Sequence, residues 1–318
     1  MTRRTDGDVT GRREPGCPPA RPRSMTRIRA VPAVAALVLL VSACAQHSDG
    51  GGARPPAVPG PTAALPDDPA ALVLQVAYTG GFLTPELIAG RLPVISVYAD
   101  GRVLTEGPVP AIYPAPAWPN VQVQQADVET VRSLVDSALA AGVAEATDVG
   151  TPGIADAPST RFTVTTASGT SVREVYALTE GAGDPNLTAV QQEARGKLVG
   201  LLTELSGLPN RLGPEGRAPA PYEPTAVAAV VRPWSPPQGD PALGQQPALP
   251  WPGPALPGEA VAPGVTCVLA SGEQARTVAA AARGANQLTP WSTGDGARWW
   301  VGFRPLLPHE AGCSDLAG

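Results

Sequence analysis

The chain has 318 residues, of which 43% are hydrophobic and 16% are charged. This composition is typical of a globular protein, and the length leaves room for one large domain or two ordinary ones. The 39 prolines and 35 glycines predict extensive loops. The net charge is −5, but eight of the 23 basic residues and only three of the 28 acidic ones precede Cys44, so the chain beyond that cysteine is strongly acidic. Such a chain repels phosphate backbones, which argues against nucleic acid as a partner.

The N-terminal segment has the features of an export signal. Residues 25–29 read MTRIR, and residues 30–43 (AVPAVAALVLLVSA) are apolar or small. This apolar run is shorter than the roughly 20 residues that cross a bilayer, and it matches the apolar part of a secretory signal peptide. Residues 1–24 are rich in arginine and poor in hydrophobic side chains, so translation is expected to start at Met25; a long leader that is removed anyway is the alternative.

The signal ends in Val41-Ser42-Ala43-Cys44, with small residues directly before the cysteine. This run resembles the lipobox of bacterial lipoproteins. The resemblance implies that a signal peptide over 25–43 is removed, that Cys44 becomes the first residue and carries fatty acyl chains such as palmitate, and that the protein is held on the outer face of the cytoplasmic membrane. Two or three acyl chains give stable anchoring where one does not. An ordinary secretory signal and an uncleaved signal anchor are the alternatives.

Residues 44–69 are rich in Gly, Pro and Ala and almost free of bulky apolar side chains, so they are expected to form a disordered tether.

The next segment, 70–208, has the pattern of an α+β domain. Asp100-Gly101 between two apolar runs predicts a hairpin with a type I′ turn. The strands expected in this segment lie at 72–78, 94–98, 103–104, 121–124, 161–165 and 172–176.

Two helices are expected in the same segment. The first begins after Asp127, a residue suited to an N-cap, has apolar residues at helical spacing and ends at Gly142. The second begins at Thr188, which forms a capping-box pattern with Gln191, and ends at Gly207. The order of strands and helices predicts an antiparallel sheet covered on one face by two helices.

Residues 209–264 are dense in proline and are expected to form a linker with one strand, 227–231, because proline blocks helices and central strands. Residues 265–318 are expected to form a small β-α-β lobe, with a helix capped by Ser271 and Gln274 and ending near Gly284. Cys267 and Cys313 are the only cysteines after Cys44, and two thiols outside the cytoplasm are expected to oxidise to a disulfide.

The C-terminal run 291–313 (WSTGDGARWWVGFRPLLPHEAGC) and the run 98–103 (YADGRV) resemble those of uncharacterised secreted lipoproteins of high-GC Gram-positive bacteria. This resemblance implies a location outside the cytoplasm and supplies no catalytic residue.

The sequence assigns no catalytic residue, metal site or cofactor. His47 lies in the expected tether, so His309 is the only histidine that can act as a general base in a folded site. The Gly-x-Ser-x-Gly motif of hydrolases, the metal-ligand spacings and the phosphate-binding glycine loops are absent from the sequence. Carboxylate pairs that hydrolyse glycosides need no motif and stay open.

Adjacent tryptophans, Trp299 and Trp300, lie on an expected strand and must face opposite sides of it. One is expected in the core. The other is expected to pack against the first domain, and the alternative is an exposed ligand platform for a glycan, a peptide or an envelope protein. The favoured hypothesis is a non-enzymatic binding or envelope-interaction module that is attached to the membrane through its lipid. The alternative is a cell-wall-active hydrolase that uses carboxylates or His309.

Overall fold

The structure, a computed structural model, describes residues 63–213, 218–239, 243 and 246–316. All of these residues lie in one compact unit. The expected signal peptide, the expected lipidation site Cys44 and most of the expected tether lie outside the described residues. Among the helices that the structure describes, none combines the length and the apolar character needed to cross a bilayer.

A first sheet is built from seven strands. Their bounds are β1 (Leu72–Gly80), β2 (Ile95–Tyr98), β3 (Arg102–Glu106), β4 (Val121–Gln125), β5 (Pro158–Thr166), β6 (Gly169–Tyr176) and β7 (Ala220–Pro221). They lie in the order β6-β5-β1-β2-β3-β4-β7, and every neighbouring pair is antiparallel. The expected antiparallel sheet of an α+β fold is confirmed.

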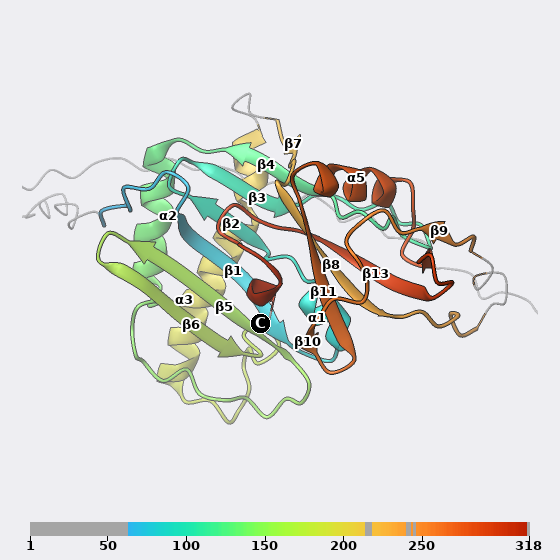
Figure 1. The fold of residues 1–318 in the computed structure, drawn as a ribbon. Helices are drawn as coiled ribbons and strands as arrows, with labels where there is room; N and C mark the ends of the chain where they lie inside the picture. Colours follow the sequence, from blue (N-terminus) through green and yellow to red (C-terminus); the bar gives the residue numbers. More distant parts are fainter. Residues whose placement is uncertain (1–62, 214–217, 240–242, 244–245, 317–318) are drawn as a thin grey trace, which may run out of the picture. The chain divides into compact units, whose positions relative to one another are not determined.

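Two helices, α2 (Val128–Ala140) and α3 (Ala189–Ser206), cover one face of this sheet, as Figure 1 shows. Asp127 caps α2 by accepting a hydrogen bond from the backbone N–H of Thr130 at 2.7 Å. The capping box expected at α3 is present. The sheet and the helices share one apolar core, so burial of the helices' apolar faces adds to the stability that the caps provide.

The hairpin between β2 and β3 is present, but its turn is not the expected type I′. That turn needs a positive φ at both central residues, and only Gly101 has one, at 87°. Asp100 acts instead through its carboxylate, which accepts hydrogen bonds from the backbone and the guanidinium of Arg102 at 3.1 and 2.7 Å. A Cβ at Gly101 would collide with the carbonyl oxygen of Ala126, so the position requires glycine.

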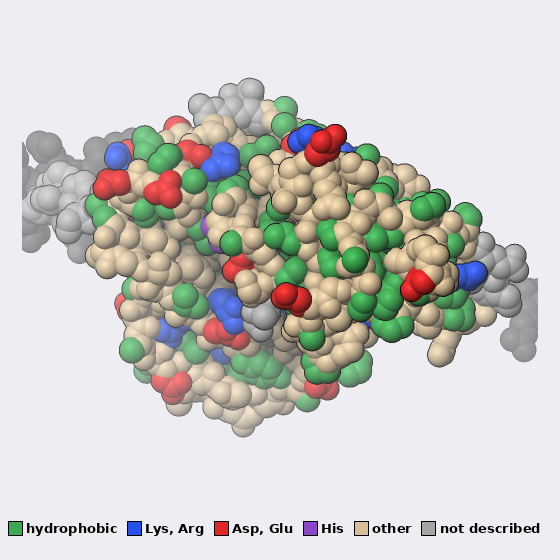
Figure 2. Space-filling model, viewed as in Figure 1, with side chains coloured by type: hydrophobic (Ala, Val, Ile, Leu, Met, Phe, Trp, Pro, Cys, Tyr) green, Lys and Arg blue, Asp and Glu red, His purple; other side chains and the backbone are tan. Residues whose placement is uncertain are grey.

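A second sheet follows along the chain, with one helix on its face. Its elements are β8 (Ala226–Pro233), β9 (Leu249–Pro250), β10 (Glu259–Ala262), β11 (Val265–Ser271), α5 (Gly272–Arg283), β12 (Trp291–Ser292) and β13 (Arg298–Pro305). The strand order is β10-β11-β8-β13-β12-β9. The expected β-α-β unit, β11-α5-β13, is therefore split, because β8 lies between its two strands and is antiparallel to both. Figure 2 shows hydrophobic side chains gathered over this sheet more densely than over the first.

The prediction of a linker with one strand over 209–264 is wrong, because the described part of this stretch holds four strands, β7 to β10. The expected strand at 227–231 lies within β8, and its residues are at most 1% exposed. Proline is compatible with these strands because it lies at the end of β8 and in two-residue strands at the sheet edges. Ser271 also differs from expectation, since its side chain makes no capping bond to α5.

The remaining short helices are α1 (Pro85–Ala89), α4 (Leu208–Leu212) and the 3-10 helix η3 (Cys313–Leu316). Although α1 connects β1 to β2, it contacts β8 and β10 of the second sheet. The segment after β13 crosses in front of the first sheet (Figure 1), where Leu307 packs with Tyr98 and Leu104. The expected disulfide between Cys267 and Cys313 is confirmed, with a Cα–Cα distance of 6.0 Å.

Candidate functional site

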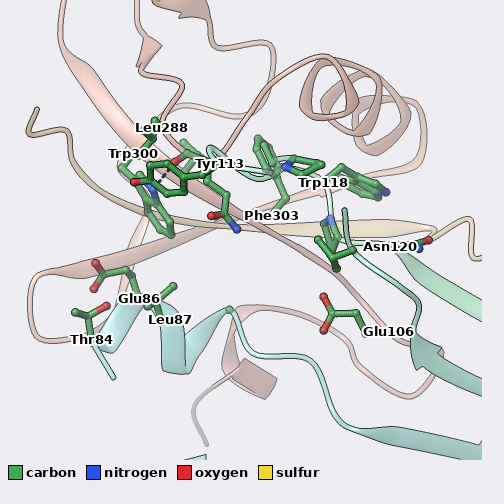
Figure 3. A pocket seen from close by; sticks show the side chains of 18 of the residues that line it. Thr84, Glu86, Leu87, Glu106, Tyr113, Trp118, Asn120, Leu288, Trp300 and Phe303 are labelled. Carbon is green, nitrogen blue, oxygen red and sulfur yellow. Dashed lines mark hydrogen bonds between the residues drawn. The ribbon is translucent and has the colours of Figure 1, made fainter. Parts of the chain in front are cut away.

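A pocket of about 470 Å³ lies between α1, the connection from β3 to β4, and strands β8 and β13 (Figure 3). Its walls therefore come from segments that are far apart in the sequence. The elements of both sheets meet here because α1, which belongs to the first part of the chain, packs on the second sheet.

The wall formed by the β3–β4 connection, residues 107–120, is fixed by hydrogen bonds. At its base, the backbone N–H of Gly107 donates to the carbonyl of Asn120 at 2.6 Å, and the Asn120 amide donates to the carbonyl of Pro108 at 2.9 Å. Further along, a backbone hydrogen bond of 3.1 Å joins Ala117 to Ala285, just after α5. The connection is thus held at its base and again beside the C-terminal end of α5.

Four aromatic rings line the pocket: Tyr113, Trp118, Trp300 and Phe303. The indole N–H of Trp300 donates to the carbonyl of Gln287 at 3.1 Å, which fixes the orientation of this ring. Trp118 and Phe303 contact each other with ring centroids 6.4 Å apart. The Tyr113 side chain is 68% exposed, so its ring is accessible to a ligand at the mouth of the pocket.

The two tryptophans of the expected platform have different surroundings. Trp299 packs against the apolar core of the second sheet, and its indole nitrogen is buried without a hydrogen-bond partner among the described residues. Trp300 lines the pocket, where the guanidinium carbon of Arg232 lies 5.0 Å from the centroid of its ring. Of the pair, only Trp300 is positioned to contact a ligand in this pocket.

The charged groups of the pocket are two carboxylates and one guanidinium. Glu86 is paired with Arg232 at 2.8 Å, and both side chains are partly buried. The Glu106 carboxylate has no hydrogen-bond or ion-pair partner among the residues that the structure describes. Partial burial of this carboxyl group raises the pKa of Glu106, although the residue keeps an exposed surface. Figure 3 shows Glu106 well separated from Glu86 along the pocket.

His309 lies elsewhere, on the first sheet. Its Nδ1 atom shares a hydrogen bond of 2.8 Å with the hydroxyl of Tyr98, and its Nε2 atom lies 3.4 Å from the amide nitrogen of Gln75. Burial raises the pKa of Tyr98, so its hydroxyl stays protonated, and desolvation lowers the pKa of His309, which favours the neutral imidazole. Both ring nitrogens therefore face protein groups.

Neither a serine nor a carboxylate is bonded to His309 in the described part of the chain. Ser96 accepts a hydrogen bond from Gln75 at 3.0 Å, and Glu310 is paired with Arg304 at 2.6 Å. A triad built on His309 is therefore not assembled. Within the same described ranges, no three or more His, Cys, Asp or Glu side chains gather where they could hold a metal ion.

Comparisons of the chain with protein-family models, with curated proteins and with solved structures give no match. The fold and the pocket are therefore the basis for any functional conclusion.

Sequence reasoning missed most of the pocket. It singled out Trp300, but gave no role to Glu86, Glu106 or Arg232. These residues lie in separate segments and form no motif, since only the packing of α1 and β3 beside β8 brings them together. The proline-rich composition of 107–120 was the one available signal, because long loops held by a rigid scaffold often carry binding residues.

Proposed function

We propose that this chain is a lipid-anchored extracytoplasmic protein that binds a ligand in the pocket beside Trp300 and does not act on it chemically. The observation that carries this proposal is the set of four aromatic rings around one pocket. Aromatic walls with a few fixed polar groups are typical of small-molecule sites, and a pocket of about 470 Å³ lies within the usual size range of such sites.

The lipid anchor and the tether give this site a location. An acylated Cys44 would hold the chain at the outer face of the membrane, and the tether over 44–69 would let the folded unit reach envelope components. Glycans, peptides and envelope proteins are the ligand classes within that reach, and aromatic rings provide flat apolar surfaces for each of them. No nucleic acid is expected, because the folded part of the chain is acidic.

A hydrolase remains the second candidate, favoured by the presence of Glu86 and Glu106 in one pocket. Glycoside hydrolysis uses two carboxyl groups with different proton affinities. Here Glu106 has a raised pKa, whereas Glu86 is paired with Arg232. The pairing weakens this candidate, because the Glu86 carboxylate already has a close guanidinium partner.

The binding proposal is tested with the full chain in detergent, titrated with soluble wall glycan fragments and short envelope peptides while tryptophan fluorescence is recorded. We expect a saturable change that Trp300→Ala removes and that Trp234→Ala, a variant outside the pocket, preserves. Binding that survives Trp300→Ala would refute the proposed site. Release of reducing ends from purified cell wall by the native chain, lost in Glu106→Gln, would refute the non-enzymatic proposal in favour of the hydrolase.

A further inference from the structure

The charges of the pocket point to the character of its ligand. Of the three acidic and basic side chains that line it, Glu86 and Arg232 neutralise each other through their 2.8 Å ion pair. Glu106 is an exposed residue whose carboxylate has no partner among the described side chains and backbone groups. The pocket thus carries one uncompensated negative charge next to an apolar surface, an arrangement that favours a positively charged partner.

The aromatic rings of the pocket already bind cations of the chain itself. The Arg232 guanidinium lies 5.0 Å from the centroid of Trp300, and the Arg283 guanidinium lies 5.2 Å from that of Trp118. Both arginines are also paired with glutamates, so they add no net positive charge. Tyr113 has no such cation partner among the described residues, and its ring, with its negative face, is open to solvent.

Apolar side chains surround the mouth of the pocket. Leu87 and Val109 line it and are 49% and 52% exposed, beside the more exposed Tyr113. Exposed apolar surface around a pocket is a common feature of binding sites. A ligand that covers this rim must therefore carry apolar groups as well as charge.

From these observations we infer that the pocket takes a cationic group, such as an amine or a quaternary ammonium, attached to an apolar body, with the Glu106 carboxylate as its counter-charge. The aromatic rings contact the cation and the apolar body, and the rim at Leu87 and Val109 covers the rest. The inference rests on the proposed function, since it specifies the ligand of the same pocket.

The test compares two probes of the same shape: benzyltrimethylammonium, which is cationic, and neopentylbenzene, its uncharged carbon isostere. Both are titrated into the full chain labelled with ¹⁵N, and the indole N–H signals of Trp118 and Trp300 are followed by NMR, so that Trp118 reports binding in Trp300→Ala. We expect the cation to bind at least about tenfold more tightly than the isostere, because interactions with a charged group exceed those of a neutral one.

Two matched variants isolate the charge of Glu106. Glu106→Gln should remove the preference for the cation and leave binding of the isostere within about twofold of the native value, since the isostere uses only apolar contacts. Glu129→Gln removes the same charge from an exposed position on α2 and should preserve the preference. Thermal melting of each variant verifies folding, and little change is expected because Glu106 holds its place in β3 through the backbone alone.

The outcomes separate this inference from the proposed function. If both probes bind equally and Trp300→Ala weakens both, the pocket binds ligands but the inference about charge is wrong. If the response of either probe is unchanged by Trp300→Ala, the pocket is not the binding site and the proposed function fails with it.

Discussion

At the scale of single residues, the most consequential polar contact lies outside the pocket. Arg304 and Glu310 form an ion pair of 2.6 Å in which the two side chains are only 3% and 7% exposed. Glu310 also accepts a hydrogen bond from the backbone N–H of Leu307 at 2.7 Å, and Arg304 donates to the carbonyl of Arg91 at 3.3 Å. The pair therefore joins the end of β13 to the segment that crosses the first sheet.

Removing one partner of this pair should strongly destabilise the fold. In Glu310→Ala the buried guanidinium of Arg304 is left without a counter-charge, and we expect the free energy of unfolding to fall by about 3–5 kcal/mol. Urea unfolding followed by tryptophan fluorescence measures the change. Glu193→Ala, which removes an exposed pair with Lys197, should cost less than about 0.5 kcal/mol.

The double variant Arg304→Met/Glu310→Leu provides a second comparison. Apolar side chains of similar volume need no counter-charge, so the double variant should be more stable than Glu310→Ala alone. A double variant that is less stable than Glu310→Ala would contradict the account, because it would show that the cost does not come from the unpaired charge.

At the scale of elements, short sequence patterns were sufficient to predict the helices and hairpins of the first sheet. Asp127 and Thr188 cap helices where the sequence indicated them, because a cap bonds to backbone groups only two or three residues away. The type I′ prediction for Asp100-Gly101 was wrong because that turn belongs to a two-residue loop, whereas β2 ends at Tyr98 and β3 begins at Arg102, which leaves three residues in the loop. The strands β7, β9 and β10 were missed because they are short and rich in proline or lie at an edge.

The disulfide ties the C-terminal segment to β11, and its removal should be costly. The sequence separation of 46 residues between Cys267 and Cys313 predicts a loss of about 4 kcal/mol in the chain-entropy model when both are replaced by alanine. Urea unfolding of the double variant and of the native chain under reducing conditions measures this loss. A loss under about 1 kcal/mol in both would show that the crosslink contributes little to stability.

At the scale of the whole molecule, the two sheets are interlocked and not merely joined in sequence. The helix α1 leaves the first sheet to pack on the second, and the segment after β13 returns to the first. The pocket exists because of this exchange of segments. The proposed lipid anchor at Cys44 lies outside the described residues.

The anchor is tested at Cys44. In a bacterial expression host, Cys44→Ser should abolish incorporation of labelled fatty acid and move the protein from the membrane fraction to the soluble fraction, because no acyl chain then inserts into the bilayer. Cys17→Ser is the control and should have no effect, since residue 17 precedes the expected start at Met25. Fatty-acid incorporation that persists in Cys44→Ser would disprove the lipid anchor.

By itself the sequence determined the α+β class, the capped helices and the pairing of Cys267 with Cys313, because these depend on local periodicity, on nearby backbone groups or on there being only two cysteines after Cys44. The tertiary structure alone decided that β8 lies at the centre of a second sheet and that Glu106 and Trp300 share a pocket with the paired Glu86 and Arg232. Those facts depend on contacts between segments that are far apart in the sequence. Such contacts arise when whole helices and strands pack together, so no pattern among neighbouring residues indicates them.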